Sequence, residues 1–111
     1  MTIQQMQQQV DEWIKSYGVR YFDEVTNTLI LQEEMGEFSR LVARIYGEQS
    51  FKNKPVDPPK ELLADEMADM VFVITCLANQ MDIDLENAML KNLEKKTGRD
   101  KHRHEKNEKL K

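Results

Sequence analysis

Apolar residues recur every three or four positions along most of the chain, the spacing of one face of an α-helix. The pattern predicts four helices, over residues 2–17, 26–46, 60–80 and 84–97. Gly18, Gly47 and Gly98 are expected to end the first, second and fourth, because glycine favours the position after a helix. Three prolines in residues 48–59 exclude a continuous helix there. The expected fold is all-α, an antiparallel bundle of about four helices.

Length and composition fit one compact, water-soluble domain of 111 residues. No apolar run approaches the roughly 20 residues needed to span a bilayer, so no membrane partner is expected. The opening MTIQQMQQQV has neither the basic nor the apolar region of a signal peptide. The single cysteine, Cys76, has no partner for an internal disulfide. Together these features predict a cytoplasmic protein.

Charge is distributed unevenly along the chain. Residues 91–111 carry a formal charge of +5, whereas residues 1–90 carry −9. The acidic body argues against a nucleic-acid partner, which requires a broad basic face. The last residues lack an apolar stripe, so we divide the chain into a helical domain, 1–98, and a basic, partly disordered tail, 99–111. The default interpretation of the basic end is a solvated tail, although it also offers cations to an anionic substrate.

Four acids occupy positions that the pattern reserves for the core. Glu34 and Glu37 are three residues apart, as are Glu66 and Asp69, so each pair shares one face of its helix. The stripe of the second predicted helix contains Ile30, Glu34, Glu37, Phe38, Leu41 and Ile45; that of the third contains Leu62, Glu66, Asp69, Met70, Val73 and Leu77. One such pair commonly faces solvent, but two pairs on adjacent antiparallel helices predict a shared cluster.

The repulsion within such a cluster can be relieved by protonation, by buried basic partners or, most directly, by a divalent cation. At a separation of ~5 Å and an effective dielectric constant of ~20, each pair of carboxylates repels by about 3 kcal/mol, and neither stripe, so defined, contains Lys or Arg. Oxygen-only ligation favours Mg²⁺, with Mn²⁺ as a substitute, over zinc. A di-iron bundle would use Glu-x-x-His pairs, whereas Glu37 and Asp69 stand where those histidines belong. The residues therefore predict a magnesium site formed by Glu34, Glu37, Glu66 and Asp69.

Two acidic motifs, EEMGE at 33–37 and EMAD at 66–69, give the chain a resemblance to a known family. They resemble the EExxE…ExxD pattern of the MazG-like nucleotide pyrophosphohydrolases. LANQMDIDLENA at 77–88 and the Lys95…Arg99-Asp100 segment are also similar, and the resemblance covers about residues 3–103. It implies Mg²⁺-dependent hydrolysis of an NTP or dNTP to the monophosphate and pyrophosphate, by a homodimer or homotetramer.

The resemblance also implies roles for individual residues. The metal ligands are Glu34, Glu37, Glu66 and Asp69. Glu33, the additional acid of EExxE, is the candidate catalytic residue, which either supports the metal ligands or orients the water. Lys95 and Arg99 are candidates to bind the polyphosphate, although cations are equally favoured at an ordinary helix end. Thr97 stands between them where the family often has Asn.

Four further residues are candidate contacts for the sugar or base. Asn79 is a candidate contact for either, or a helix-capping residue. Trp13, Tyr21 and Phe22 are candidates to stack on a base, although aromatic residues more often pack in a core or interface, which we favour for Trp13.

A second hypothesis is a non-catalytic, oligomeric, helical nucleotide-binding or regulatory module. Long apolar helix faces cover each other incompletely in so short a chain, so self-association is expected under both hypotheses. The acids separate the two hypotheses, because a scaffold has no need for four carboxylates within its core stripes.

Overall fold

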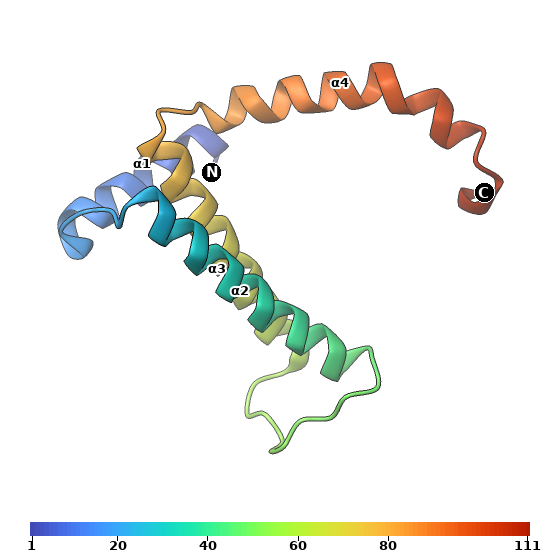
Figure 1. The fold of residues 1–111 in the computed structure, drawn as a ribbon, viewed down its shortest axis with the longest axis horizontal. Coiled ribbons are helices and arrows are strands. Elements are labelled where there is room, and N and C mark those ends of the chain that lie inside the picture. Colours follow the sequence, from blue (N-terminus) through green and yellow to red (C-terminus); the bar gives the residue numbers. More distant parts are fainter.

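The computed structural model describes residues 1–111, apart from the side chains of residues 100–102. Its elements are α1 (Ile3–Trp13), a π-helical turn (Ile14–Gly18), α2 (Glu24–Ile45), α3 (Pro59–Gln80), α4 (Leu85–Glu105) and a 3₁₀ turn (Glu108–Leu110). The described backbone contains no strand, so the predicted all-α fold is confirmed. Helices α2 and α3 lie side by side and antiparallel, joined by an open loop (Figure 1).

Local sequence signals explain where the helices begin. Thr2 caps α1 in a reciprocal capping box with Gln5. The carboxylate of Asp23 accepts a hydrogen bond from the Thr26 amide at 2.7 Å, which caps α2. Helix α3 begins at Pro59, where the missing amide hydrogen costs nothing. Asp84 accepts a hydrogen bond from the Asn87 amide at 3.0 Å and caps α4.

The helix ends differ from prediction at one glycine. Helix α2 ends just before Gly47, where an added Cβ would come within 2.7 Å of the Ala43 carbonyl oxygen. The predicted end at Gly98 is wrong, because α4 continues through it to Glu105. A glycine inside a helix costs only about 1 kcal/mol, and the Lys- and Glu-rich flanking sequence favours helix. Residue 98 thus lies inside α4, and the division into 1–98 and 99–111 stays a prediction.

A small core joins α1 to the C-terminal half of α3. Val10 and Ile14 are buried against Cys76, and Met6, Tyr21 and Phe72 pack around them. The connection from α1 to α2 leaves the π-helical turn through Val19, whose φ of 69° is strained for a β-branched residue. This core anchors α1 and the connection beside the α2–α3 pair.

The single chain is open rather than compact. Helix α4 packs against α1 and otherwise leads away from the α2–α3 pair (Figure 1). The radius of gyration is 17.7 Å, whereas a compact chain of this length has about 13 Å. The accessible surface is 9093 Å², against about 6,400 Å² expected for a compact monomer of this mass. Among the described residues, no helix combines the length and hydropathy required to cross a membrane.

Candidate active site

Three carboxylates converge between α2 and α3. One oxygen of each of Glu34, Glu37 and Glu66 lies within 4.8 Å of the others. Glu34 and Glu37 share a face of α2, and Glu66 projects from the antiparallel α3 beside it. The two acidic motifs, one on each helix, predicted that their carboxylates would meet between the helices, and these three do.

The interior of this group contains two carboxylate oxygens without partners. Oε2 of Glu34 and Oε2 of Glu66 are buried, and among the described residues neither accepts a hydrogen bond. A buried acceptor left unsatisfied costs roughly 1–3 kcal/mol, and more when it is charged. A bound cation would supply both oxygens with the partner that the chain itself does not provide.

The electrostatics of the group favour protonation in the absence of a cation. Burial raises the pKa of Glu66 to about 7, aided by its contact with Glu34 and by the negative charge of Glu37. Burial likewise raises the pKa of Glu34 above its usual value. Because these carboxylates hold protons more tightly than free ones, a divalent cation that replaces the protons fits the donor set.

Two further acids lie at the edge of the group. Asp69 is half-buried one turn beyond Glu66, and burial, followed by the charges of Asp65 and Glu37, raises its pKa. It lines a cavity together with Glu34 rather than joining the close group. Glu33 is exposed beside Glu34. The structure therefore gathers three of the five predicted acids tightly and places the other two adjacent to them.

A cavity of about 570 Å³ with aromatic walls begins at Glu34 and Asp69. Trp13 and Phe72 form one wall, meeting edge to face with ring centroids 5.6 Å apart. Phe22, which is 60% exposed, belongs to the connection on the opposite side. The candidates Trp13, Tyr21 and Phe22 therefore all border a cavity that reaches the carboxylates.

Asn27 is a polar residue of this cavity that the sequence did not single out. It is 5% exposed, and its Nδ2 donates to the Phe22 carbonyl at 3.3 Å and to Gln80 Oε1 at 2.8 Å. Gln80 Nε2 also donates to the Phe22 carbonyl. These bonds tie the connection to both α2 and α3 and thereby fix one wall of the cavity.

A second, smaller cavity of about 230 Å³ lies on the other side of the carboxylates. Glu37 and Glu66 line it together with Arg40 and Arg44, one and two turns further along α2. The expectation that no cation lies on the inner faces of the two helices is wrong for Arg44. Arg44 stands seven residues after Glu37 and is half-buried, a position that the heptad spacing indicates once Leu41 is placed inward.

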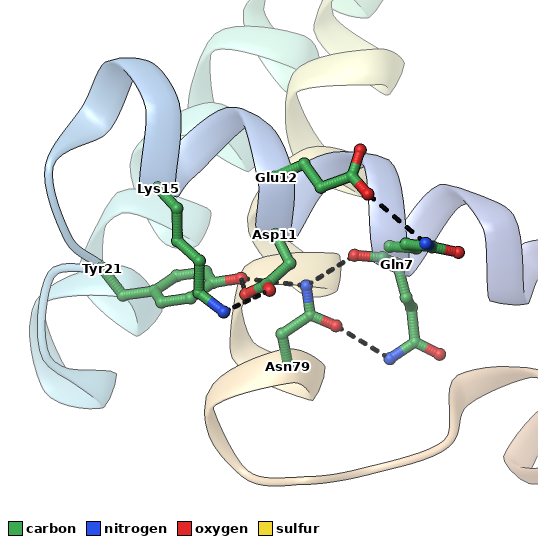
Figure 2. A network of polar contacts seen from close by, with 7 residues as sticks. Gln7, Asp11, Glu12, Lys15, Tyr21 and Asn79 are labelled. Carbon is green, nitrogen blue, oxygen red and sulfur yellow. Dashed lines mark hydrogen bonds and ion pairs between the residues drawn. The ribbon is translucent and has the colours of Figure 1, made fainter.

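Asn79 belongs to a polar network that joins α1 to α3 (Figure 2). Its Nδ2 donates to the Gln7 carbonyl and to Tyr21 Oη, each at 3.0 Å, and its Oδ1 accepts from Gln7 Nε2 at 3.1 Å. Tyr21 Oη in turn donates to Asp11 Oδ1 at 2.6 Å. The Asn79 amide is therefore engaged within the chain, and its contact with a nucleotide stays a prediction.

The predicted phosphate-binding cations lie on a different helix from the carboxylates. Lys95 and Arg99 are on α4, which packs against α1 and leads away from the α2–α3 pair (Figure 1). Within one chain the structure does not bring them to the acid group. Their role in binding phosphate therefore stays a prediction.

The residues 22–104 match the family model of the MazG nucleotide pyrophosphohydrolase domain. YpjD of Bacillus subtilis (strain 168) is 37% identical over 102 residues, which are 92% of this chain and 89% of that protein. A crystal structure of YpjD from Bacillus subtilis superposes with a TM-score of 0.74 at 35% identity, covering 86% of this chain and 94% of the other. A crystal structure of the Bacillus-conserved MazG protein, a nucleotide pyrophosphohydrolase, gives 0.74 at 34% identity, with 92% and 96% covered.

The fold and the acid group thus define a helical hydrolase of nucleotides. The chain belongs to the MazG nucleotide pyrophosphohydrolase family. It is a nucleotide pyrophosphohydrolase, and the resemblance found in its two acidic motifs is confirmed.

Proposed function

We propose that the chain hydrolyses nucleoside or deoxynucleoside triphosphates to the monophosphate and pyrophosphate, with Mg²⁺ as cofactor and Mn²⁺ as a substitute. The proposal rests on two observations: Glu34 and Glu66 each bury an oxygen without a partner among the described residues, and one oxygen of each of Glu34, Glu37 and Glu66 lies within 4.8 Å of the others. Hard oxygen donors without His or Cys select Mg²⁺ or Mn²⁺ over softer metals. Membership of the family supplies the reaction class.

In this proposal Glu34, Glu37, Glu66 and Asp69 hold the metal, and the exposed Glu33 orients the attacking water. When bound, the metal neutralises phosphate charge and lowers the pKa of water. The water oxygen bonds to the α-phosphorus, the bond from that phosphorus to the bridging oxygen breaks, and pyrophosphate leaves with that oxygen. Glu33 orients that water, and the proton that the water releases passes to solvent.

The aromatic cavity is the proposed place for the base and sugar. It opens directly on Glu34 and Asp69, so a nucleoside inside it presents its phosphates to the carboxylates. Flat rings of Trp13 and Phe72 suit stacking on a base, since every base has an aromatic face. The nucleotide monophosphate is the product expected to remain on this side.

The proposed assembly is a homodimer or a homotetramer. The single chain exposes about 2,700 Å² more surface than a compact monomer of its mass. Many large apolar side chains of α2, α3 and α4 are exposed, among them Leu29, Met35, Met67, Leu90 and Leu93. Because α4 leads away from its own acid group, Lys95 and Arg99 would reach phosphates bound by a second copy. An obligate dimer interface is large and apolar in the same way.

A nucleotide panel tests the proposal. The protein is incubated with each NTP and dNTP and Mg²⁺, and pyrophosphate and monophosphate are measured. Glu37→Gln keeps the shape but removes one ligand charge, and we expect it to lose more than the roughly 10–100-fold typical of a residue that only supports a metal ligand. Glu61→Gln, a matched change at an exposed acid on α3, should keep full activity.

Two outcomes would overturn the proposal: no pyrophosphate from any nucleotide, or full activity in Glu37→Gln. Binding of a nucleotide without turnover would instead favour the non-catalytic binding or regulatory module. A chelator should abolish the activity, and adding back Mg²⁺ or Mn²⁺ in excess should restore it. Activity that survives the chelator would show that no exchangeable divalent cation is required.

A further inference from the structure

The two cavities and the carboxylates follow one another along the α2–α3 pair. The aromatic cavity ends at Glu34 and Asp69, the carboxylates follow, and the smaller cavity begins at Glu37 and Glu66. A nucleotide has the same order of base, sugar and phosphates. A nucleoside in the aromatic cavity therefore directs its terminal phosphates across the carboxylates and toward the smaller cavity.

We infer that Arg44, with Arg40 one turn before it, forms a subsite for the two terminal phosphates and hence for product pyrophosphate. This inference rests on the proposed function, because it assumes that a polyphosphate crosses the acid group. The inference places the cationic contact with phosphate on α2, whereas the candidates predicted from the sequence lie on α4. Both arginines line the smaller cavity, and so do Glu37 and Glu66 of the carboxylate group.

The surroundings of Arg44 are those of a cation that binds an anionic ligand. Its Nε is buried and donates no hydrogen bond to any described residue. Its guanidinium carbon lies over the Phe51 ring, 5.6 Å from the ring centre, a cation–π contact that helps to hold the side chain in place. An unsatisfied charged donor is costly, so the position indicates a ligand that accepts from it.

The nearby acids do not fill that role. Asp65 and Glu66 line the same cavity, yet among the described side chains Arg44 forms no ion pair within 4.0 Å with either. Phosphate oxygens suit the planar fork of an arginine, which can donate two parallel hydrogen bonds. Metal on the carboxylate side and arginine on the other would neutralise the leaving pyrophosphate from both ends.

A purely structural role for Arg44, as a counter-charge to Glu37 and Glu66, predicts a different result. In that case its loss disturbs the acid group and weakens all ligands alike. A phosphate subsite instead affects the ligand that carries the terminal phosphates. Inhibition by inorganic pyrophosphate compared with inhibition by the nucleoside monophosphate therefore separates the two roles.

The experiment measures both product inhibition constants for the wild type, Arg44→Gln and Arg44→Lys. Loss of a charge-assisted contact should raise the constant for pyrophosphate about ten- to a hundredfold in Arg44→Gln. The constant for the monophosphate should stay within about twofold, and Arg44→Lys should be intermediate because it keeps charge without the fork. Lys54→Gln, an equal charge change in the exposed loop, should match the wild type.

The subsite is overturned if pyrophosphate inhibits Arg44→Gln as well as it inhibits the wild type, or if both products weaken equally. Should Arg44→Gln fail to fold by circular dichroism, Arg44→Lys and Arg40→Gln decide by the same criterion. Calorimetric titration of the wild type and variants with pyrophosphate and Mg²⁺ needs no turnover. An enzyme without activity on any nucleotide that still binds pyrophosphate through Arg44 would refute the proposed function and leave the subsite standing.

Discussion

Glu34 on α2 and Glu66 on α3 each bury a carboxylate oxygen that no described residue satisfies, and both belong to one group with Glu37. A fold gains nothing from two such oxygens unless a ligand completes them. The carboxylates thus destabilise the metal-free chain, and a cation that binds there removes this unfavourable free energy. Stability and cofactor binding should be coupled through these two residues.

The first prediction concerns the stability of the metal-free protein against pH. The pKa of Glu66 is about 7 in the folded state and starts from 4.5 in the unfolded chain. Between these values the folded state binds more protons at Glu66 than the unfolded state does, so the contribution of Glu66 to stability is fully present below pH 4.5 and is lost as pH rises through 7. Thermal melting in chelator should therefore show a lower Tm at pH 7.5 than at pH 5.5.

Mg²⁺ and the variant Glu66→Gln provide the controls for this prediction. Saturating Mg²⁺ should raise the Tm at pH 7.5 and remove most of the pH dependence, because it binds only the folded state. Metal-free Glu66→Gln should melt above the wild type at pH 7.5, and Mg²⁺ should reverse that order. Equal melting of the metal-free wild type at both pH values would contradict the argument.

The second prediction concerns the Tyr21 hydroxyl, which links Asp11 to Asn79 (Figure 2). Burial and Asp11 raise the pKa of Tyr21 to about 12, so the hydroxyl remains a donor throughout the neutral range. Tyr21→Phe removes the hydrogen bonds from the hydroxyl to Asp11 and from Asn79 to the hydroxyl, although Asp11 keeps its ion pair with Lys15 and Asn79 its bonds with Gln7. This loss should cost about 1–2 kcal/mol of unfolding free energy in urea. Tyr17→Phe, at a ring that is 76% exposed, should change little at the same protein concentration.

The helices and the carboxylate pairs were predictable because both are local patterns. Residues three or four apart share a helix face whatever the tertiary structure, so Glu34 with Glu37 and Glu66 with Asp69 could be paired from spacing alone. The side of each helix that faces the other followed from the apolar stripe. Among the helix ends expected at glycines, the one at Gly98 was wrong, since nothing at that position requires the conformation that glycine alone permits.

The parts that escaped prediction depend on contacts between distant segments. Arg44 lies next to Ile45 of the predicted stripe, and its contact with Phe51 of the following loop becomes visible only in the fold. Asn27 gains its position from Gln80, which is 53 residues away. Asn79 faces Gln7 and Tyr21, so its amide is engaged between α1 and α3. Neither propensity nor periodicity encodes which polar group meets which across the fold.

The third prediction uses Trp13, the one tryptophan of the chain. It lines the aromatic cavity with half of its surface exposed, so a base that stacks there should change its fluorescence. Titration of a nucleoside triphosphate with Ca²⁺ in place of Mg²⁺ should give a saturable change in emission. Inorganic pyrophosphate should bind without that change, and equal responses to both ligands would place the base elsewhere.

The last prediction concerns the exposed apolar stripe of α4. Met89, Leu90 and Leu93 recur at helical spacing and are 43%, 57% and 54% exposed. If a second copy covers this stripe, light scattering on an eluting sample should give the mass of a dimer or tetramer. Leu90→Asp would then bury a charge in the interface and should lower the mass and raise the concentration needed for assembly. Asn92→Asp adds the same charge at an exposed polar position nearby and should keep the wild-type mass. A monomeric wild type, or a Leu90→Asp variant that assembles normally, would show that this stripe is no interface.

Activity measured on the same samples tests Lys95 and Arg99. Phosphate contacts that a second copy supplies should be lost when assembly is lost, whereas the carboxylates of α2 and α3 remain in place.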